Sequence, residues 1–318
     1  MAGAGMILRR LSYESASKGG SRLQSTAKAL LLLPRSFRLQ CVRWQGRGRD
    51  SGEPLRATYC GEGESLDYLR VRLFAEVASE QREQVTFAAA LGEMQSNGED
   101  GLGIIEINRL LKTWLPGGAL ITFPWIRQVV DLQGPFYAAS RSRLQATYGR
   151  RVRQHKYEVH ETRRADDIAQ FYHALYRDYV QHRFQQMTHA RTREELVQAG
   201  RHGVLLQIFR GGANVSGVLC RVHRDTITAV AFGLAVPYDE NLRRGALSAA
   251  YYYLFCWAEA RHLRYVDLLR SRPDRADGVF EHKRRWGAEV FHDPWCHTVM
   301  GIYPRGRAAA GTGSFISF

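Results

Sequence analysis

Apolar residues between positions 165 and 270 follow helical and strand-like spacings in an order that defines a fold class. A helical stripe runs over Asp166–Arg183, and Thr192-Arg-Glu-Glu195 reads as a capping box that begins a second helix. Gly211-Gly212 fits a tight hairpin between two strands. The elements after the second helix are three apolar strands, a buried helix and another strand, at 204–209, 215–222, 226–234, 246–262 and 263–269. This order predicts an α+β fold with a mixed, mostly antiparallel sheet flanked by helices.

The region before position 140 has a weaker pattern. Leu66, Leu69, Leu73 and Val77 have helical spacing and predict a helix over 65–79. The other expected elements are a helix at 85–95, a loop at 97–101, a helix at 108–115 and short strands at 104–107 and 119–123. We therefore divide the folded chain into a reduced N-terminal half at 58–140, a main domain at 141–304 and a flexible tail at 305–318.

The net charge of +14 is concentrated at the N-terminus. Residues 1–57 hold 11 Lys or Arg and 3 Asp or Glu, a net charge of +8, which leaves the remaining residues at only +6. The folded part is therefore not a uniformly basic nucleic-acid binder. Residues 1–57 fit a disordered basic tail, a transit peptide or a start placed too far upstream. No apolar run approaches the ~20 residues that span a bilayer. We expect a cytoplasmic protein, with a transit-peptide-like N-terminus as the alternative.

Cysteine and histidine positions limit the chemistry. The five cysteines are widely spaced without a C-x-x-C pair, which favours a reducing compartment over a disulfide scaffold. His292, Cys296 and His297 match no standard zinc spacing, so we expect no metal site. The sequence has no P-loop, no dinucleotide fingerprint and no nucleophilic-triad context, so we expect no covalent acyl-enzyme.

The strongest chemical signal is an apolar strand, an Arg-rich loop and a short helix over residues 263–291. Asp277 can cap the helix, on which Val279, Lys283 and Trp286 share one face. Lys283 therefore points at least partly inward, where an ammonium costs several kcal/mol unless it has a partner or lines a site. The alternative is a lysine that extends along its alkyl stem to reach water.

This segment resembles the C-terminal signature of Fem-type transferases, a branch of the GNAT acyltransferase superfamily. Gly278, Phe280, Lys283, Trp286 and Gly287 match its form, G-x-[FY]-x-x-K-x-x-[FW]-G. The resemblance continues upstream through residues 245–251 and, more loosely, back to position 143. It implies a GNAT-like fold for the main domain and a smaller, degenerate GNAT-like N-terminal half.

The resemblance also implies where anionic groups would bind. In GNAT folds a donor's phosphates meet a helix N-terminus, where free N–H groups and the helix dipole favour anions. The equivalent loop here supplies the candidate cofactor-binding residues Arg243, Arg244, Gly245 and Ala246. The loop has a single glycine, and Leu242 stands where the acetyl-CoA loop usually has Gln or Arg, which favours the Fem-type branch. The candidate substrate-binding residues come from the 270–275 loop and a basic helix at 142–155: Arg270, Arg272, Arg143 and Arg151. As alternatives, these are surface arginines, or form an ion pair such as Arg270 with Asp274.

By resemblance, Lys283 would stabilise the negative charge that develops on a carbonyl oxygen during acyl transfer. Asp267 is the candidate base, with Asp277, Glu281 and His223 as alternatives. The resemblance implies transfer from acyl-CoA or aminoacyl-tRNA to an amine on a polar, anionic acceptor, such as a cell-wall or exopolysaccharide precursor. Two alternatives stay open: a CoA-dependent N-acetyl- or N-acyltransferase, and a non-catalytic GNAT-fold module that binds polyanions. The oligomeric state is open.

Overall fold

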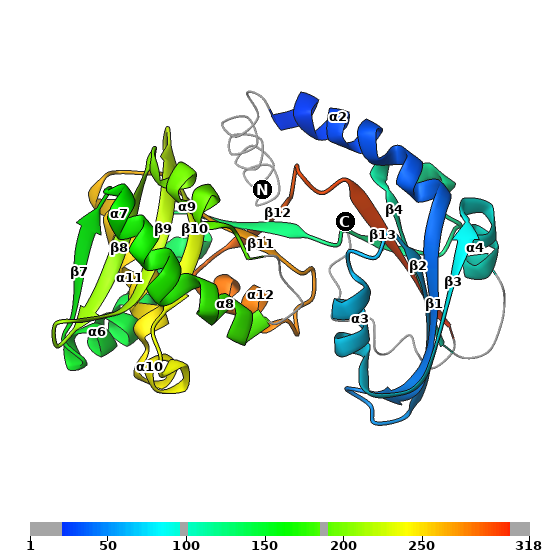
Figure 1. The fold of residues 1–318 in the computed structure, drawn as a ribbon, viewed down its shortest axis with the longest axis horizontal. Coiled ribbons are helices and arrows are strands. Elements are labelled where there is room, and N and C mark those ends of the chain that lie inside the picture. Colours follow the sequence, from blue (N-terminus) through cyan, green and yellow to red (C-terminus); the bar gives the residue numbers. More distant parts are fainter. Residues whose placement is uncertain (1–20, 96–100, 185–189, 306–318) are drawn as a thin grey trace. The chain divides into compact units, whose positions relative to one another are not determined.

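The computed structural model describes residues 21–95, 101–184 and 190–305 (Figure 1). The chain divides into two compact units, each built from separate stretches of sequence. The first unit comprises residues 1–126, 271–281 and 291–318, and the second comprises residues 127–270 and 282–290. Each unit contains one large β-sheet, six-stranded in the first and seven-stranded in the second.

The second unit carries the predicted α+β core. Its sheet has the order β12-β6-β11-β10-β9-β8-β7, in which β7–β8, β8–β9 and β9–β10 are antiparallel and β10–β11 is parallel. The strands are β6 (Ile126–Asp131), β7 (Tyr157–Thr162), β8 (Gly203–Arg210), β9 (Ala213–His223), β10 (Thr226–Leu234), β11 (Tyr265–Ser271) and β12 (Glu289–His292). The predicted mixed, mostly antiparallel sheet flanked by helices is confirmed.

The helices of this region follow local signals in the sequence. The capping box at Thr192 is present, with Thr192 Oγ1 accepting from the Glu195 N–H at 3.2 Å, and starts α9 (Arg193–Gly200). The predicted helix at 166–183 is formed by α7 (Ala165–Phe171), a π-helical turn (Tyr172–Tyr176) and α8 (Arg177–Phe184). The remaining helical segments are α5 (Pro135–Leu144), a π-helical turn (Gln145–Gly149), α6 (Arg150–Gln154), α10 (Tyr238–Arg244), α11 (Ala246–Ala260) and α12 (Gly278–Arg285).

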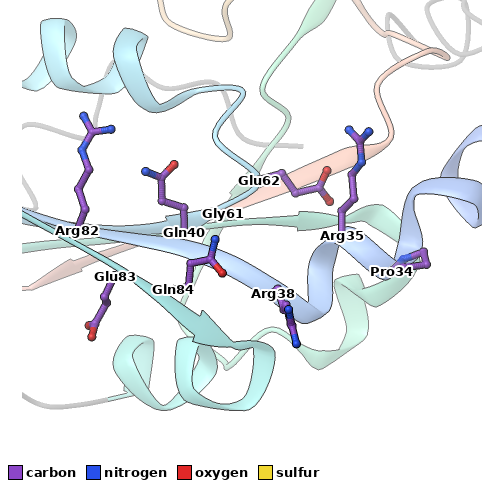
Figure 2. A pocket seen from close by; sticks show the side chains of 9 residues that line it. All are labelled: Pro34, Arg35, Arg38, Gln40, Gly61, Glu62, Arg82, Glu83 and Gln84. Atoms are coloured by element: carbon purple, nitrogen blue, oxygen red, sulfur yellow. The ribbon is translucent and has the colours of Figure 1, made fainter.

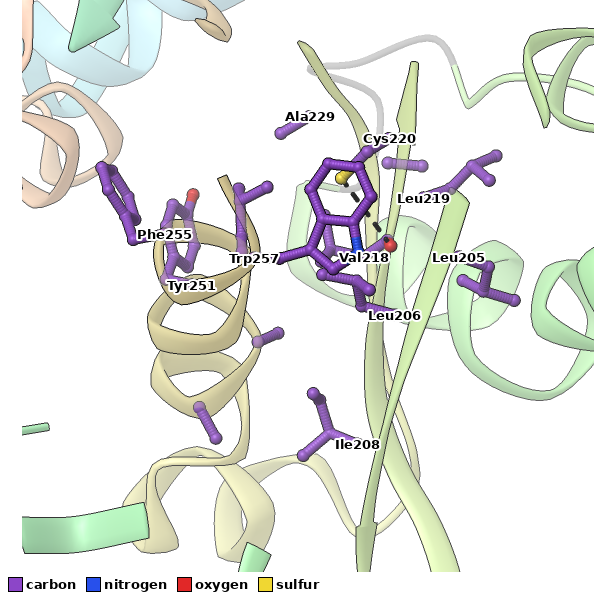
Figure 3. Packing of buried hydrophobic residues seen from close by; sticks show 14 of the residues in the cluster. Leu205, Leu206, Ile208, Val218, Leu219, Cys220, Ala229, Tyr251, Phe255 and Trp257 are labelled. Atoms are coloured by element: carbon purple, nitrogen blue, oxygen red, sulfur yellow. Dashed lines mark hydrogen bonds between the residues drawn. The ribbon is translucent and has the colours of Figure 1, made fainter. Parts of the chain in front are cut away.

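The core of the second unit lies between α11 and the central strands. Figure 3 shows Trp257 of α11 facing apolar residues of β8 and β9, whereas Tyr251 and Phe255 project from the other side of the helix. Trp257 is held at one edge, because its Nε1 donates to Glu161 Oε2 at 2.8 Å and the Arg261 guanidinium lies 3.8 Å from its ring centroid. This packing fixes the C-terminal end of α11 relative to the sheet.

The sheet of the first unit has the order β3-β1-β2-β4-β13-β5. Its strands are β1 (Arg38–Gly48), β2 (Pro54–Gly61), β3 (Phe74–Thr86), β4 (Gly101–Asn108), β5 (Leu120–Thr122) and β13 (Thr298–Arg305). Its helices are α2 (Ser21–Leu32), α3 (Leu66–Leu73), α4 (Phe87–Gln95) and two 3-10 helices (Leu33–Phe37 and Arg109–Trp114). Two apolar clusters form on the sheet, one containing Trp44 and α3 residues and the other containing Cys41 and α4 residues.

The expected tail over residues 1–57 differs from the structure in its described part. β1 is a central strand whose Leu39 and Cys41 enter one apolar cluster while Val42 and Trp44 enter the other. The basic residue Arg43 pairs with Glu83 and Glu93, which offsets its charge. Residues 1–20 lie outside the described residues.

The expected helix over 65–79 is also corrected. The helix ends at Leu73, and residues from Phe74 onward form β3, which pairs antiparallel with β1 at the sheet edge. Backbone pairing with β1 therefore overrides the helical spacing of Val77. The expected helix at 108–115 is a 3-10 helix, and the expected helix at 85–95 and strands at 104–107 and 119–123 are present as α4, β4 and β5.

The unit boundaries also differ from those expected from the sequence. The first long boundary falls at Arg127 rather than at position 141, and β13 belongs to the first unit. The expected loop at 97–101 falls almost wholly, and the expected tail at 305–318 from position 306 onward, outside the described residues. Within the described ranges, no helix is both long and apolar enough to cross a membrane.

Candidate active site

Lys283 lies on α12 and is buried. The helix begins as predicted, because Asp277 Oδ1 accepts from the N–H groups of Val279 and Phe280 at 2.9 and 3.0 Å. Lys283 is only 5% exposed, and its Nζ donates to the Arg270 carbonyl oxygen at 2.7 Å. The inward orientation expected from the helical face is confirmed. The catalytic role of Lys283 stays a prediction.

An unusual turn within β11 positions the Arg270 carbonyl, which accepts the hydrogen bond from Lys283. Leu269 has φ +61°, in the left-handed region that residues with side chains rarely adopt. Asp267 Oδ1 accepts from the Leu269 N–H at 2.9 Å, and Asp267 Oδ2 accepts from Arg127 Nε at 2.7 Å. Asp267 is 1% exposed, so this carboxylate stabilises the turn from inside the protein. Its contacts are those of a positioning residue for Arg270.

His282 adjoins Lys283 and was missed in the sequence analysis, which weighed His223 instead. The His282 ring meets the Tyr251 ring edge-on at 4.7 Å, and its buried Nε2 makes no hydrogen bond within the described structure. Burial, followed by the positive charges of Arg183, Lys283 and Arg285, lowers the pKa of His282 to about 4. The imidazole is therefore neutral at neutral pH and can offer a ring nitrogen as an acceptor.

A group of stacked aromatic rings lies beside His282. The Trp286 ring, 1% exposed, stacks on Phe255 at 4.8 Å and on Tyr148 at 4.6 Å, and Tyr251 stacks on Phe232 at 4.1 Å. Trp286 Nε1 is a second buried nitrogen with no hydrogen-bond partner among the described residues. His282 lies on α12 and Trp286 directly follows this helix, and both rings contact Tyr251, so the two ring nitrogens without a partner in the described structure occur close together. The sequence feature that could have drawn attention to His282 is its spacing of four residues from Trp286.

The predicted anion-binding loop lies at the start of α11. Gly245 has φ +83° and separates α10 from α11, a conformation that favours glycine. A Cβ at position 245 would lie 3.6 Å from Arg151 Cδ, so Arg151 and the N-terminal end of α11 are brought together. Arg244 instead pairs with Glu240 at 2.7 Å, Arg243 is exposed, and the Ala246 side chain is fully buried. The same Cβ would lie 3.8 Å from Arg151 Nη1, so the Arg151 guanidinium stands beside this loop.

Arg143 and Arg272 have other contacts. Arg143 Nη2 donates to the Arg285 carbonyl at 3.3 Å, beside α12. Arg272 belongs to the first unit, where it donates to Ser65 Oγ and to the carbonyls of Pro124 and Glu64 at 3.1 to 3.2 Å. Its guanidinium also lies 3.7 Å from the centroid of the Trp125 ring. Arg272 thus serves the packing of the first unit.

The first unit also contains a polar pocket of about 790 Å³ that the sequence analysis missed, because it treated residues 1–57 as a tail. Figure 2 shows Arg82, Gln40 and Arg35 on one side of the strands and Glu83 on the other. Glu62 accepts from Ser36 Oγ at 2.8 Å and lies 3.1 Å from His297 Nε2. The full lining is Pro34, Arg35, Arg38, Gln40, Gly61, Glu62, Arg82, Glu83 and Gln84.

The three residues considered for a metal have separate partners. His297 contacts Glu62, Cys296 Sγ donates to the Thr298 carbonyl at 3.4 Å, and the His292 ring meets Phe123 edge-on at 4.5 Å. In the part of the chain that the structure describes, no group of three or more potential ligands is suited to a metal ion.

Fem-type and GNAT proteins are among the solved structures that this chain resembles. It is similar to FemX (9% identity, TM-score 0.41, covering 86% of this chain and 90% of that one). It is also similar to L-PGS from Bacillus licheniformis (11% identity, TM-score 0.40, 85% and 87%). A third is a GCN5-related N-acetyltransferase from Sphaerobacter thermophilus (13% identity, TM-score 0.34, 80% and 78%). These similarities concern the backbone and assign no substrate or catalytic residue to this chain. No family model matches the sequence, and no curated protein matches it.

Proposed function

We propose that this protein is an acyl- or aminoacyltransferase of the Fem-like GNAT type, which forms an amide on an amine acceptor beside α12. The observation that carries the proposal is the pair His282 and Lys283. A buried ammonium held by the Arg270 carbonyl stands next to a neutral imidazole with an unsatisfied Nε2. One group favours negative charge and the other accepts a hydrogen bond, which are the two needs of amine attack on a carbonyl.

In the proposed reaction, the nitrogen of the bound amine attacks the carbonyl carbon of the donor thioester or ester. A C–N bond forms, and the carbonyl electron pair moves onto oxygen, where the Lys283 ammonium stabilises the charge. The intermediate then collapses and the C–S or C–O bond breaks. The amine loses one proton and the departing sulfur or oxygen gains one, so the protons balance. His282 Nε2 orients the amine by accepting a hydrogen bond from it.

The donor is proposed to bind at the start of α11. Acyl-CoA and aminoacyl-tRNA both carry phosphates, and the α11 N-terminus beside Arg151 offers N–H groups and a guanidinium. Tyr251, which contacts His282, lies five residues after Ala246, or about 8 Å along the helix axis. This spacing supports one donor reaching both places. The acceptor is proposed to be polar and anionic, with cell-wall or exopolysaccharide precursors as the first class to test.

The test begins with mass spectrometry of small molecules that co-purify with the full chain, followed by transfer assays with CoA thioesters and aminoacyl-tRNA. Lys283→Met removes the ammonium and keeps the stem, and Lys112→Met is the matched control at an exposed position. We expect Lys283→Met to lower the transfer rate by about 10²- to 10³-fold, the usual effect of removing one oxyanion donor. Lys112→Met should match wild type.

The alternatives give different results. Retained CoA and acetyl transfer to a simple amine would identify the CoA-dependent enzyme. Equal rates for Lys283→Met and wild type would contradict the proposed role of Lys283. If no donor is consumed and the chain binds many polyanions with strong salt dependence, the non-catalytic binding module is the correct reading.

A further inference from the structure

Two cysteines of the first unit face each other inside its sheet. Cys41 on β1 and Cys60 on β2 are direct register partners in an antiparallel pair. Their sulfurs are 3.1 Å apart, and the residues are 1% and 0% exposed. Their separation of 19 positions in the chain gives no local sign of this pairing.

We propose that Cys41 and Cys60 are a redox modification site, at which a peroxide converts the two thiols into a reversible disulfide. The Cys41 thiolate attacks one peroxide oxygen, the O–O bond breaks, and a sulfenic acid and water form after proton uptake. Cys60 sulfur then attacks the Cys41 sulfur, the S–O bond breaks, and a second water leaves. Two thiols are oxidised by two electrons, and one peroxide is reduced to two waters.

The geometry of the strands suits this bond. Directly opposed residues of an antiparallel pair have Cβ atoms about 4.5–5.5 Å apart, a range that meets the upper end of disulfide geometry at about 4.5 Å. Forming an S–S bond of about 2 Å from the present separation requires the sulfurs to approach by about 1 Å. Side-chain rotation and a small local shift of the strands provide a movement of this size.

The surroundings distinguish the two sulfurs. Cys60 Sγ donates to Cys41 Sγ, and this hydrogen bond, assisted by the charge of Arg43, lowers the pKa of Cys41 against the effect of burial. The same pairing, together with burial, raises the pKa of Cys60. Cys41 is therefore the attacking sulfur and Cys60 the resolving one. Because both are covered by the α4 side of the sheet, reaction requires a local opening and is slow.

The bond has a structural consequence at the pocket of Figure 2. Gln40 and Gly61 adjoin the two cysteines and line that pocket, and they are themselves register partners. A Cys41–Cys60 disulfide at the adjacent register position would hold Gln40 and Gly61 together where they line the pocket. The link also restricts the unfolded chain, so the first unit resists unfolding more strongly after oxidation.

The test treats the reduced full chain with hydrogen peroxide and maps linked peptides without reduction. We expect a Cys41–Cys60 peptide, an intact mass lower by about 2 Da from the loss of two hydrogens, full reversal by a thiol reductant, and a higher unfolding midpoint. Cys41→Ala and Cys60→Ala should lose the mass decrease and the midpoint shift. Cys256→Ala, a change at a cysteine of the second unit, should keep both.

Peptide mapping of the wild-type chain decides the matter even where a variant folds poorly. Absence of the Cys41–Cys60 peptide after prolonged treatment, or conversion of Cys41 to sulfinic acid while Cys60 stays a thiol, would overturn the proposal. A linked peptide accompanied by a lower unfolding midpoint would show that the bond forms outside the native sheet, which also contradicts it.

Discussion

Acidification should expose the unusual environment of His282. The pKa of this imidazole falls from 6.5 to about 4 in the folded protein, mainly through burial and then through three nearby cations. A histidine with a lowered folded pKa binds a proton more readily in the unfolded chain than in the folded protein. Its contribution to stability is therefore present above about pH 6.5 and is lost as the pH falls towards about 4.

The size of the effect follows from the two pKa values. A difference of about 2.5 pKa units corresponds to about 3 kcal/mol in the free energy of unfolding once the pH is below both values. At about pH 5 the unfolded histidine is almost fully protonated and the folded one mostly neutral, so about 2 kcal/mol is already lost. This is a large fraction of the stability of an ordinary domain.

Urea unfolding from about pH 8 to pH 5 measures this loss. His282→Phe keeps a ring against Tyr251 but cannot titrate, and His223→Gln changes an exposed histidine as the control. The difference in unfolding free energy between wild type and His282→Phe should be constant above about pH 7.5 and shift by about 2 kcal/mol against wild type by about pH 5. His223→Gln should follow the wild-type curve. Parallel curves for wild type and His282→Phe would refute the reasoning, because they would mean that His282 titrates alike in both states.

Two further predictions concern the sheet of the first unit and the reaction itself. A Cβ at Gly61 would lie 2.4 Å from Tyr59 Oη and 2.8 Å from Glu106 Cβ, so Gly61→Ala should lower stability by about 1–3 kcal/mol in denaturant unfolding. Gly92→Ala, in helix α4 with open space around it, should instead raise stability by up to about 1 kcal/mol, and a loss there equal to that of Gly61→Ala would contradict the argument. In a transfer assay, the rate from about pH 5.5 to pH 8 should follow the pKa of the acceptor amine and show no inflection from His282. An inflection near the ordinary histidine pKa that His282→Phe removes would show that the imidazole titrates in the active protein.

Local signals in the sequence were sufficient for much of the second unit. The capping box at Thr192, the hairpin at Gly211-Gly212 and the cap of α12 by Asp277 each depend on residues within a few positions of one another. Such contacts depend little on residues far away in the chain, so a local sequence pattern can predict them. The apolar strands and the buried helix α11 follow from their composition in the same way.

The first unit was harder to predict because its strands are defined by pairing with segments that are far away in the chain. β3 is an edge strand whose residues after Phe74 are mostly exposed, so only its backbone pairing with β1 defines it. β1 in turn sends Leu39 and Cys41 to one cluster and Val42 and Trp44 to the other. The basic residue Arg43 obscured this alternation, because its acidic partners Glu83 and Glu93 lie 40 and 50 residues away in the chain.

The candidate site shows the same division between what a helix dictates and what packing adds. The helical face of α12 predicted the inward orientation of Lys283. Only the structure shows that His282 has a ring nitrogen without a hydrogen-bond partner among the described residues, and that its pKa is too low for efficient proton abstraction at neutral pH. The nearby Lys283 ammonium, one of the causes of that low pKa, is also the group that we propose stabilises the oxyanion. Both properties favour an acceptor amine that arrives unprotonated and is oriented by His282. Asp267, whose role as a base stays a prediction, accepts from the Leu269 N–H at the turn before the Arg270 carbonyl that Lys283 contacts. The site is thus better suited to placing charges than to moving protons, which matches a direct attack by a bound amine.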